Sequence, residues 1–86
     1  MPNKNYEKGR RKEYKICNEL REEGFEIVQR TAGSHSPIDI IAINKDFGEI
    51  RFIQAKPDSM AEKVKLDLLK ENKWLNGWFE VTFEVL

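Results

Sequence analysis

The sequence predicts an α/β fold in which two helices flank a central mixed sheet of four strands, in the chain order α-β-β-β-α-β. Two segments place apolar residues at helical spacing. Between them lie two short runs rich in isoleucine and phenylalanine, separated by a turn sequence, and the C-terminal residues alternate between apolar and polar side chains. We therefore expect a helix, a strand, a β-hairpin, a second helix and a final strand.

The first helix is predicted over residues 6–23. Cys17 and Leu20 belong to an apolar stripe along one face, and Gly24 is expected to end the helix as its C-cap. Glu13 lies on the line of this stripe, because it precedes Cys17 by one helical turn. Glu13 either continues the buried face or marks the point where the stripe ends half exposed.

A short strand is predicted over residues 25–30, with Phe25 and Ile27 on one face. A loop of small residues, 31–36, follows it. Backbone N–H groups of such a loop, together with the hydroxyl of Ser34, can approach a phosphate closely. An ordinary connection between strands would have the same composition, so both interpretations stay open.

The centre of the chain is typical of a β-hairpin. Residues 38–43 and 50–55 are the expected strands, and residues 44–49, which contain Asp-Phe-Gly, are the expected turn. In such a pair the start of the first strand lies near the end of the second. Polar residues at these two positions would therefore meet.

Three polar residues stand at these positions. Asp39 begins the first strand, while Gln54 and Lys56 end the second and share a face because they are two residues apart. A carboxylate, an amide oxygen and an ammonium group are costly on an apolar scaffold. Together they are suited to binding a divalent metal and a phosphate, and we expect a site here.

The second helix is predicted over residues 60–74, with Asp58 or Ser59 as its N-cap. Asn76-Gly77 then turns the chain. The final strand, residues 78–86, alternates apolar and polar side chains, which predicts one buried and one polar face.

Length and composition indicate a single domain, residues 1–86, with 40% apolar and 35% charged residues. One cysteine excludes an intramolecular disulfide and any cysteine-based zinc site, and no run approaches the roughly 20 apolar residues of a membrane helix. A cytoplasmic protein without a membrane partner is expected. The net charge is zero, yet basic residues outnumber acidic ones in residues 1–15, which favours a local contact with an anion or simply a solvated helix face.

The polar residues are suited to phosphodiester hydrolysis. Mg²⁺, for which Mn²⁺ can substitute, prefers oxygen ligands, usually one or two carboxylates with waters and a substrate phosphate. Asp39 and Glu13 would supply carboxylates, and the Gln54 side chain and the Ala55 backbone carbonyl would complete the set. Lys56 would orient or deprotonate the water, or stabilise the charged phosphate.

The chain resembles the PD-(D/E)xK nuclease superfamily, specifically the archaeal Holliday-junction resolvases. The resemblance spans about residues 7–56 and implies a restriction-endonuclease-like fold. Five elements carry it in the family's order: Lys8-Gly9 before Glu13, Gly24-Phe25 leading to Arg30, Gly33-Ser34, Pro-Ile-Asp-Ile-Ile-Ala at 37–42, and Gln54-Ala55-Lys56.

The resemblance implies a Mg²⁺-dependent endodeoxyribonuclease of DNA recombination and repair that acts on branched DNA as a homodimer. It places Glu13 and Asp39 as catalytic, metal-binding acids, Gln54 at the second acid of the motif, and Lys56 as the catalytic lysine. The DNA contacts that it implies are Arg30 and Ser34 near the scissile phosphate and Lys8, Arg10 and Arg11 along the backbone.

The sequence departs from the family at Gln54, where the resolvases usually have glutamate, although some restriction-type branches use glutamine. Three alternatives therefore stay open: a restriction or repair nuclease for duplex DNA, a nucleic-acid-binding homologue without catalysis, and a small dimeric interaction domain that binds no nucleic acid. An aromatic patch favours dimerisation or simply caps the core. Its members are Trp74, Leu75, Trp78 and Phe79.

Overall fold

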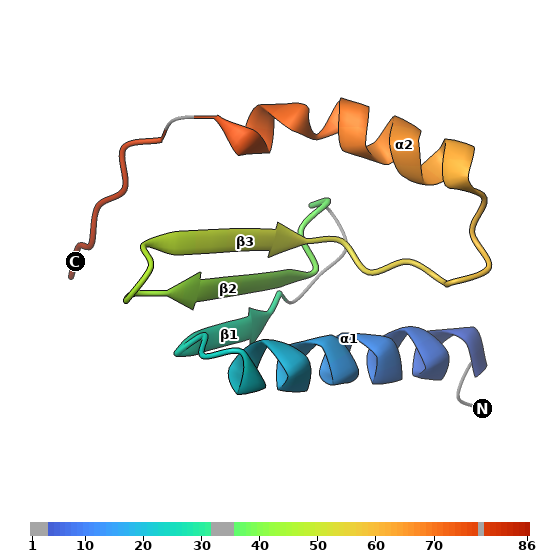
Figure 1. Cartoon of the computed structure of the whole chain (residues 1–86), viewed down its shortest axis with the longest axis horizontal. Helices are drawn as coiled ribbons and strands as arrows, with labels where there is room; N and C mark the ends of the chain where they lie inside the picture. The colour runs from blue at the N-terminus through green and yellow to red at the C-terminus, as the bar shows by residue number, and fades with distance from the viewer. Residues whose placement is uncertain (1–3, 32–35, 78) are drawn as a thin grey trace.

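The computed structural model describes residues 4–31, 36–77 and 79–86, with the side chains of the first helix described from Gly9 onward. Two helices lie on either side of a small sheet (Figure 1). The elements are α1 (Lys4–Glu22), β1 (Ile27–Arg30), β2 (Ile40–Asn44), β3 (Glu49–Ile53), α2 (Glu62–Glu71) and a 3-10 helix, η1 (Lys73–Asn76). No helix of these described residues is long and apolar enough to cross a membrane.

The sheet is antiparallel, in the order β1-β2-β3. Its register places Arg30 of β1 opposite Ile40 of β2, and Ile40 in turn opposite Ile53 of β3. The predicted hairpin is therefore confirmed, but its strands are shorter than predicted at the site end. Asp39 lies just before β2, and Gln54 and Lys56 lie after β3, so the prediction that Gln54 and Lys56 share a face of the strand was wrong. The turn of the hairpin contains Gly48, whose φ of 63° lies in the left-handed region that favours glycine.

Helix α1 ends at Glu22, and the turn that follows contains the predicted capping residue Gly24, which has a φ of 103°. The N–H of Gly24 donates to the carbonyl of Arg21 at 3.1 Å, and the N–H of Phe25 donates to that of Leu20 at 3.1 Å. These bonds use carbonyl groups of the last helical turn that have no partner within the helix. They direct the chain from α1 into β1.

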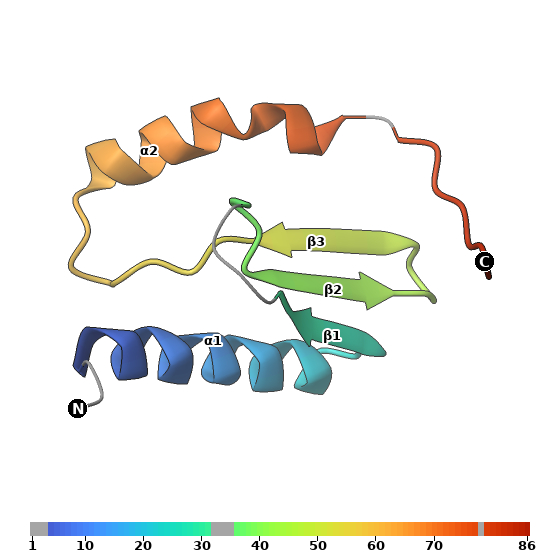
Figure 2. The ribbon, with the colours of Figure 1, turned by 180° about the vertical axis from the view of Figure 1, so that it is seen from behind.

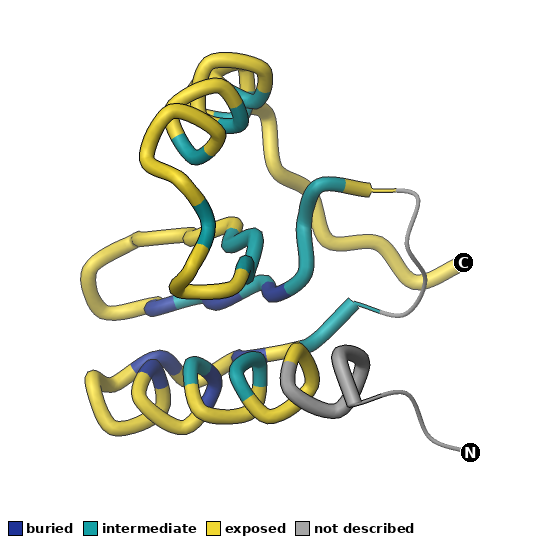
Figure 3. Tube along the Cα trace, turned by 90° about the vertical axis from the view of Figure 1, so that its right-hand side faces the viewer, coloured by how far each residue is buried: buried dark blue, intermediate teal, exposed yellow. Residues whose placement is uncertain are grey.

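The core lies between α1 and one face of the sheet (Figure 3). Within β1 the buried residue is Val28, whereas Ile27 is about half exposed. The prediction that Phe25 and Ile27 share a strand face was wrong, because β1 begins only at Ile27 and Phe25 enters the core from the preceding turn. The buried apolar residues are Cys17, Leu20, Phe25, Val28, Ile40 and Ala42.

Helix α2 lies on the other side of the sheet, and the view from behind shows the long connection that leads to it from β3 (Figure 2). None of its residues is buried. The residue at its N-cap is Ala61, which makes no side-chain capping bond. The prediction of Asp58 or Ser59 as the N-cap was therefore wrong, because the chain stays irregular beyond both residues.

The predicted fourth strand is not formed. Residues 79–86 have no regular secondary structure, and Trp78 lies outside the described residues. The sheet of the described residues is therefore three-stranded and antiparallel, where the sequence predicted four strands in a mixed sheet. Alternation favours a strand only if a neighbouring edge supplies backbone partners, and this segment instead leads past the turn of the β2–β3 hairpin (Figure 1). Its apolar side chains are exposed: Phe79, Val81, Phe83 and Val85.

Candidate active site

Asp39 lies directly before β2 and is bonded to the segment that follows β3. Its backbone N–H donates to the carbonyl of Ile53 at 2.8 Å. Its carboxylate Oδ2 accepts the N–H of Ala55 at 2.8 Å. Ala55 stands between Gln54 and Lys56, so the proximity of Asp39 to these two residues, predicted from the hairpin, is confirmed in the structure.

Glu13 of α1 pairs with Arg30 at the end of β1. Arg30 Nε donates to Glu13 Oε1 at 3.1 Å, and both side chains are largely shielded from solvent. Because Arg30 lies opposite Ile40, the residue after Asp39, this pair and Asp39 occupy the same end of the sheet. Glu13 is thus half-buried by an ion pair and is not a member of the apolar core.

The ring of Tyr14 lies beneath two guanidinium groups. The Arg30 Cζ is 4.5 Å from the ring centroid, and that of Arg10 is 5.4 Å from it. Arg10 also donates to the Tyr14 hydroxyl at 3.3 Å. This hydrogen bond and the charges of Arg10 and Arg30 lower the pKa of Tyr14. Sequence analysis missed Tyr14, although its spacing of four residues from Arg10 was a usable signal.

Lys12, also missed, connects α1 to the chain after β3. Its Nζ donates to the backbone carbonyl of Lys56 and pairs with Asp58 Oδ1 at 2.8 Å. The hydrogen bond and the charge of Lys12 lower the pKa of the Asp58 carboxyl. These residues are 44 and 46 positions apart from Lys12 in the chain, so no local pattern predicts the contacts.

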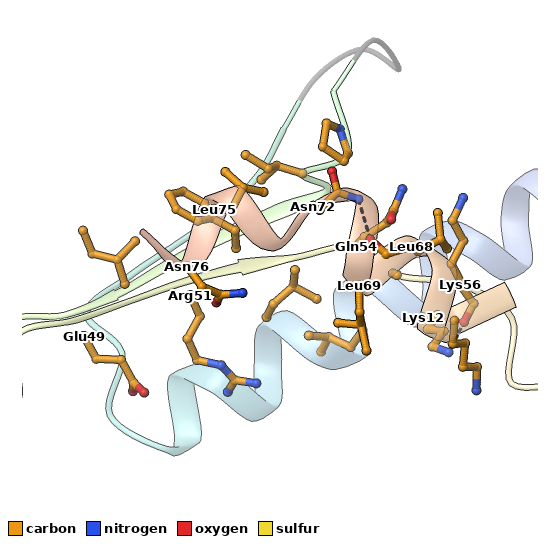
Figure 4. A pocket seen from close by; sticks show the side chains of 18 residues that line it. Lys12, Glu49, Arg51, Gln54, Lys56, Leu68, Leu69, Asn72, Leu75 and Asn76 are labelled. Carbon is orange, nitrogen blue, oxygen red and sulfur yellow. Dashed lines mark hydrogen bonds between the residues drawn. The ribbon is translucent and has the colours of Figure 1, made fainter. Parts of the chain in front are cut away.

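A cavity of about 740 Å³ lies between β3 and α2. Figure 4 shows Lys12, Gln54 and Lys56 at one end of it. Leu68, Leu69 and other apolar side chains of α2 and β3 line the rest. Gln54 and Lys56 thus border a space that a ligand can reach, whereas the predicted acids Glu13 and Asp39 are not among the residues that line it.

The oxygen atoms at the Asp39 end of the sheet are the kind of ligand that a hard divalent cation prefers. Asp39 supplies a carboxylate beside Gln54 and Ala55, which carry neutral oxygen donors. One oxygen of Glu13 is engaged by Arg30. The described residues contain no group of three or more histidine, cysteine, aspartate or glutamate side chains able to hold a metal, which agrees with glutamine at position 54. A metal here would therefore retain several waters.

The remaining predicted contacts lie on α1 and in the loop before β2. Arg11 is exposed on α1. Lys8 belongs to the same helix, but its side chain lies outside what the structure describes, as does the whole of Ser34. The candidate surface for DNA therefore rests on Arg10, Arg11 and Arg30 among the described side chains.

Two acids, a lysine and an arginine at one end of a small sheet define a candidate nuclease site. A family model, archaeal Holliday junction resolvase (Hjc), matches residues 4–76. The chain belongs to this family, which confirms the resemblance predicted from its motifs and makes it a Holliday-junction-resolvase-like nuclease acting on DNA. No curated protein and no solved structure gives a significant match.

Proposed function

We propose that the protein is a divalent-metal-dependent endonuclease that cuts branched DNA, with a four-way junction as its substrate. The observation that carries the proposal is the hydrogen bond from the Ala55 N–H to the Asp39 carboxylate, which sets Asp39 beside Gln54 and Lys56. Membership of the resolvase family supports the choice of substrate.

Asp39, Glu13 and the oxygens of Gln54 and Ala55 would hold Mg²⁺ or Mn²⁺. The bound ion supplies charge neutralisation at the phosphate and lowers the pKa of a water. Lys56 would orient or deprotonate that water, or stabilise the charge that develops on phosphate. Arg30, which Glu13 and Tyr14 hold at the same end of the sheet, would bind the scissile phosphate with its planar guanidinium.

The DNA backbone would follow the basic first half of α1. Lys8, Arg10 and Arg11 precede Glu13 in the sequence, and Ser34 would reach the phosphate from the loop before β2. A homodimer would present two such sites to the two-fold symmetric arms of a junction. Exposed Trp74 and Phe79, whose rings meet edge to face at 6.5 Å, support an interface near the C-terminal end of α2.

Cleavage of labelled DNA in Mg²⁺ and in Mn²⁺ tests the function. The substrates are a four-way junction, a linear duplex of the same sequence and a single strand. We expect cutting of the junction alone, and a loss of about 100-fold or more in Asp39→Asn and in Lys56→Ala. Asp46→Asn is the matched control, because Asp46 is an exposed carboxylate in the turn of the same hairpin.

Other results would change the assignment. Cutting of the duplex or the single strand would retain the chemistry but replace the substrate. DNA that is bound but never cut would favour a binding protein, and glutamine at position 54 gives this second candidate its specific support. Gln54→Glu separates the two cases: cleavage gained by Gln54→Glu means that only a metal ligand is weak, because an amide oxygen is neutral.

A further inference from the structure

Lys56, the proposed catalytic lysine, lies outside regular secondary structure. β3 ends at Ile53, and the chain has no regular element again until α2 begins at Glu62. Ladder hydrogen bonds therefore do not fix the backbone of Lys56. Helix α2, the next element along the chain, has no buried residue of its own. Other contacts must hold this residue in place.

Two hydrogen bonds hold the backbone on both sides of Lys56. Asp39 accepts the N–H of Ala55. Lys12 donates to the carbonyl of Lys56 and, through the same ammonium, to Asp58 Oδ1 at 2.8 Å. Pro57 lies between the two acceptors and restricts the preceding residue to extended conformations. A charged donor to a carbonyl makes a stronger bond than a neutral one.

We infer that Lys12 is a positioning residue. By binding the backbone carbonyl of Lys56, it holds Lys56 at a fixed position relative to Glu13. The inference rests on the proposed function, because it assigns Lys56 to catalysis. Lys12 is the neighbour of Glu13 on α1, so its bond connects the helix that carries one acid to the segment that carries the lysine. The two halves of the site then keep one relative position.

The competing explanation is that Lys12 only attracts DNA as one more basic residue of α1. Its ammonium already has two partners within the molecule, and its side chain is only 31% exposed. Asp58 also neutralises its charge. These contacts favour positioning over attraction, and the two explanations predict different effects on cleavage and on affinity.

The first test compares Lys12→Met with Lys15→Met and Lys12→Arg. Lys15 is exposed on the same helix, and its charge also lowers the pKa of Asp58. Unlike Lys12, it makes no hydrogen bond among the described residues. We expect Lys12→Met to slow single-turnover cleavage of the junction about 10- to 100-fold, with no greater loss of DNA affinity than Lys15→Met. DNA affinity is measured for each variant in the Asp39→Asn background. Lys12→Arg, which keeps a charged donor, should cleave the junction at most of the wild-type rate.

The second test needs neither DNA nor metal. Hydrogen exchange of the backbone amides of residues 54–56 and of Asp58 should become about tenfold faster or more in Lys12→Met, and stay unchanged in Lys15→Met. Unchanged exchange, or a loss of affinity without a slower cleavage step, would overturn the inference. If the wild-type protein cuts no DNA, the proposed function fails and the catalytic part of the inference fails with it. The exchange result still decides whether Lys12 holds the segment.

Discussion

At the scale of single residues, Arg30 is held from two directions. Its Nε–H donates a hydrogen bond to the Glu13 carboxylate, and the ring of Tyr14 lies beneath its guanidinium. An arginine side chain loses rotamer freedom when it binds a phosphate. Because these two contacts order the side chain beforehand, part of that entropic cost is already met when DNA arrives.

Replacing Tyr14 separates the ring from the hydroxyl. Tyr14→Leu removes the surface beneath Arg30 and Arg10. We expect it to weaken junction binding about five- to thirtyfold, since a cation–π contact at a partly exposed site contributes about 0.5–1 kcal/mol for each of the two arginines. Tyr14→Phe keeps the ring and should bind nearly as well as wild type. Fluorescence anisotropy of labelled DNA in the Asp39→Asn background measures both. Equal weakening by the two variants would assign the effect to the hydroxyl.

The lowered pKa of Tyr14 gives a pH test of the same cluster. Arg10, through its hydrogen bond and charge, and then Arg30 favour the phenolate. The contribution of the ionised Tyr14 to the stability of the fold is therefore present above the pKa of tyrosine in the unfolded chain. It is lost as the pH falls through the pKa of Tyr14 in the folded protein. In a Tyr6→Phe background, phenolate absorbance should appear at lower pH than in the same protein with Arg10→Gln. High salt should reduce the difference, because Tyr14 is exposed; coincident titration curves would contradict the contact.

At the scale of elements, the β2–β3 hairpin depends on Asn44, the one buried polar residue among the described part of the chain. Its Oδ1 accepts the N–H groups of Asp46 and Phe47 at 3.1 and 3.2 Å. These bonds close the turn that sets the register of the two strands. The register in turn brings Asp39 to Ala55.

Asn44→Ala should lower the free energy of unfolding by about 2 kcal/mol, because two backbone donors lose their acceptor. Urea denaturation followed by circular dichroism measures the change. Lys45→Ala, an exposed substitution in the same turn, is the control and should stay within about 0.5 kcal/mol of wild type. If Asn44→Ala lowers the free energy of unfolding by less than about 0.5 kcal/mol, water has replaced the side chain as the acceptor of the two N–H groups.

Sequence patterns predicted those parts of the fold and site that depend on local spacing. Antiparallel pairing sufficed to bring Asp39 to Gln54 and Lys56, and Gly24 indicated the end of α1. The partners of Glu13 and Lys12 could not be predicted, because Arg30 and Asp58 reach them only through the packing of the sheet and its following segment against α1. The final strand failed because an alternating pattern does not specify which edge it pairs with.

At the scale of the whole molecule, apolar side chains remain exposed around α2 and the C-terminal segment. Trp74, Phe79 and the apolar residues that follow are more than half exposed. An exposed apolar surface of this kind is typical of an interaction site. We expect the protein to sediment as a dimer at micromolar concentration.

Analytical ultracentrifugation tests this expectation. Trp74→Arg should shift the protein toward the monomer, because a charge would be buried at the centre of the interface. Ile27→Lys on β1, at the opposite edge of the sheet from β3, is the matched control and should leave the dimer intact. A wild-type monomer at micromolar concentration would contradict the proposed homodimer.

The buried cysteine of α1 has a practical consequence. Cys17 is the only thiol of the chain, and it is 1% exposed between α1 and the sheet. An alkylating reagent can reach it only when the helix separates from β1 and β2. The rate at which Cys17 is alkylated therefore reports how often α1 separates from the sheet, without any added label or engineered probe.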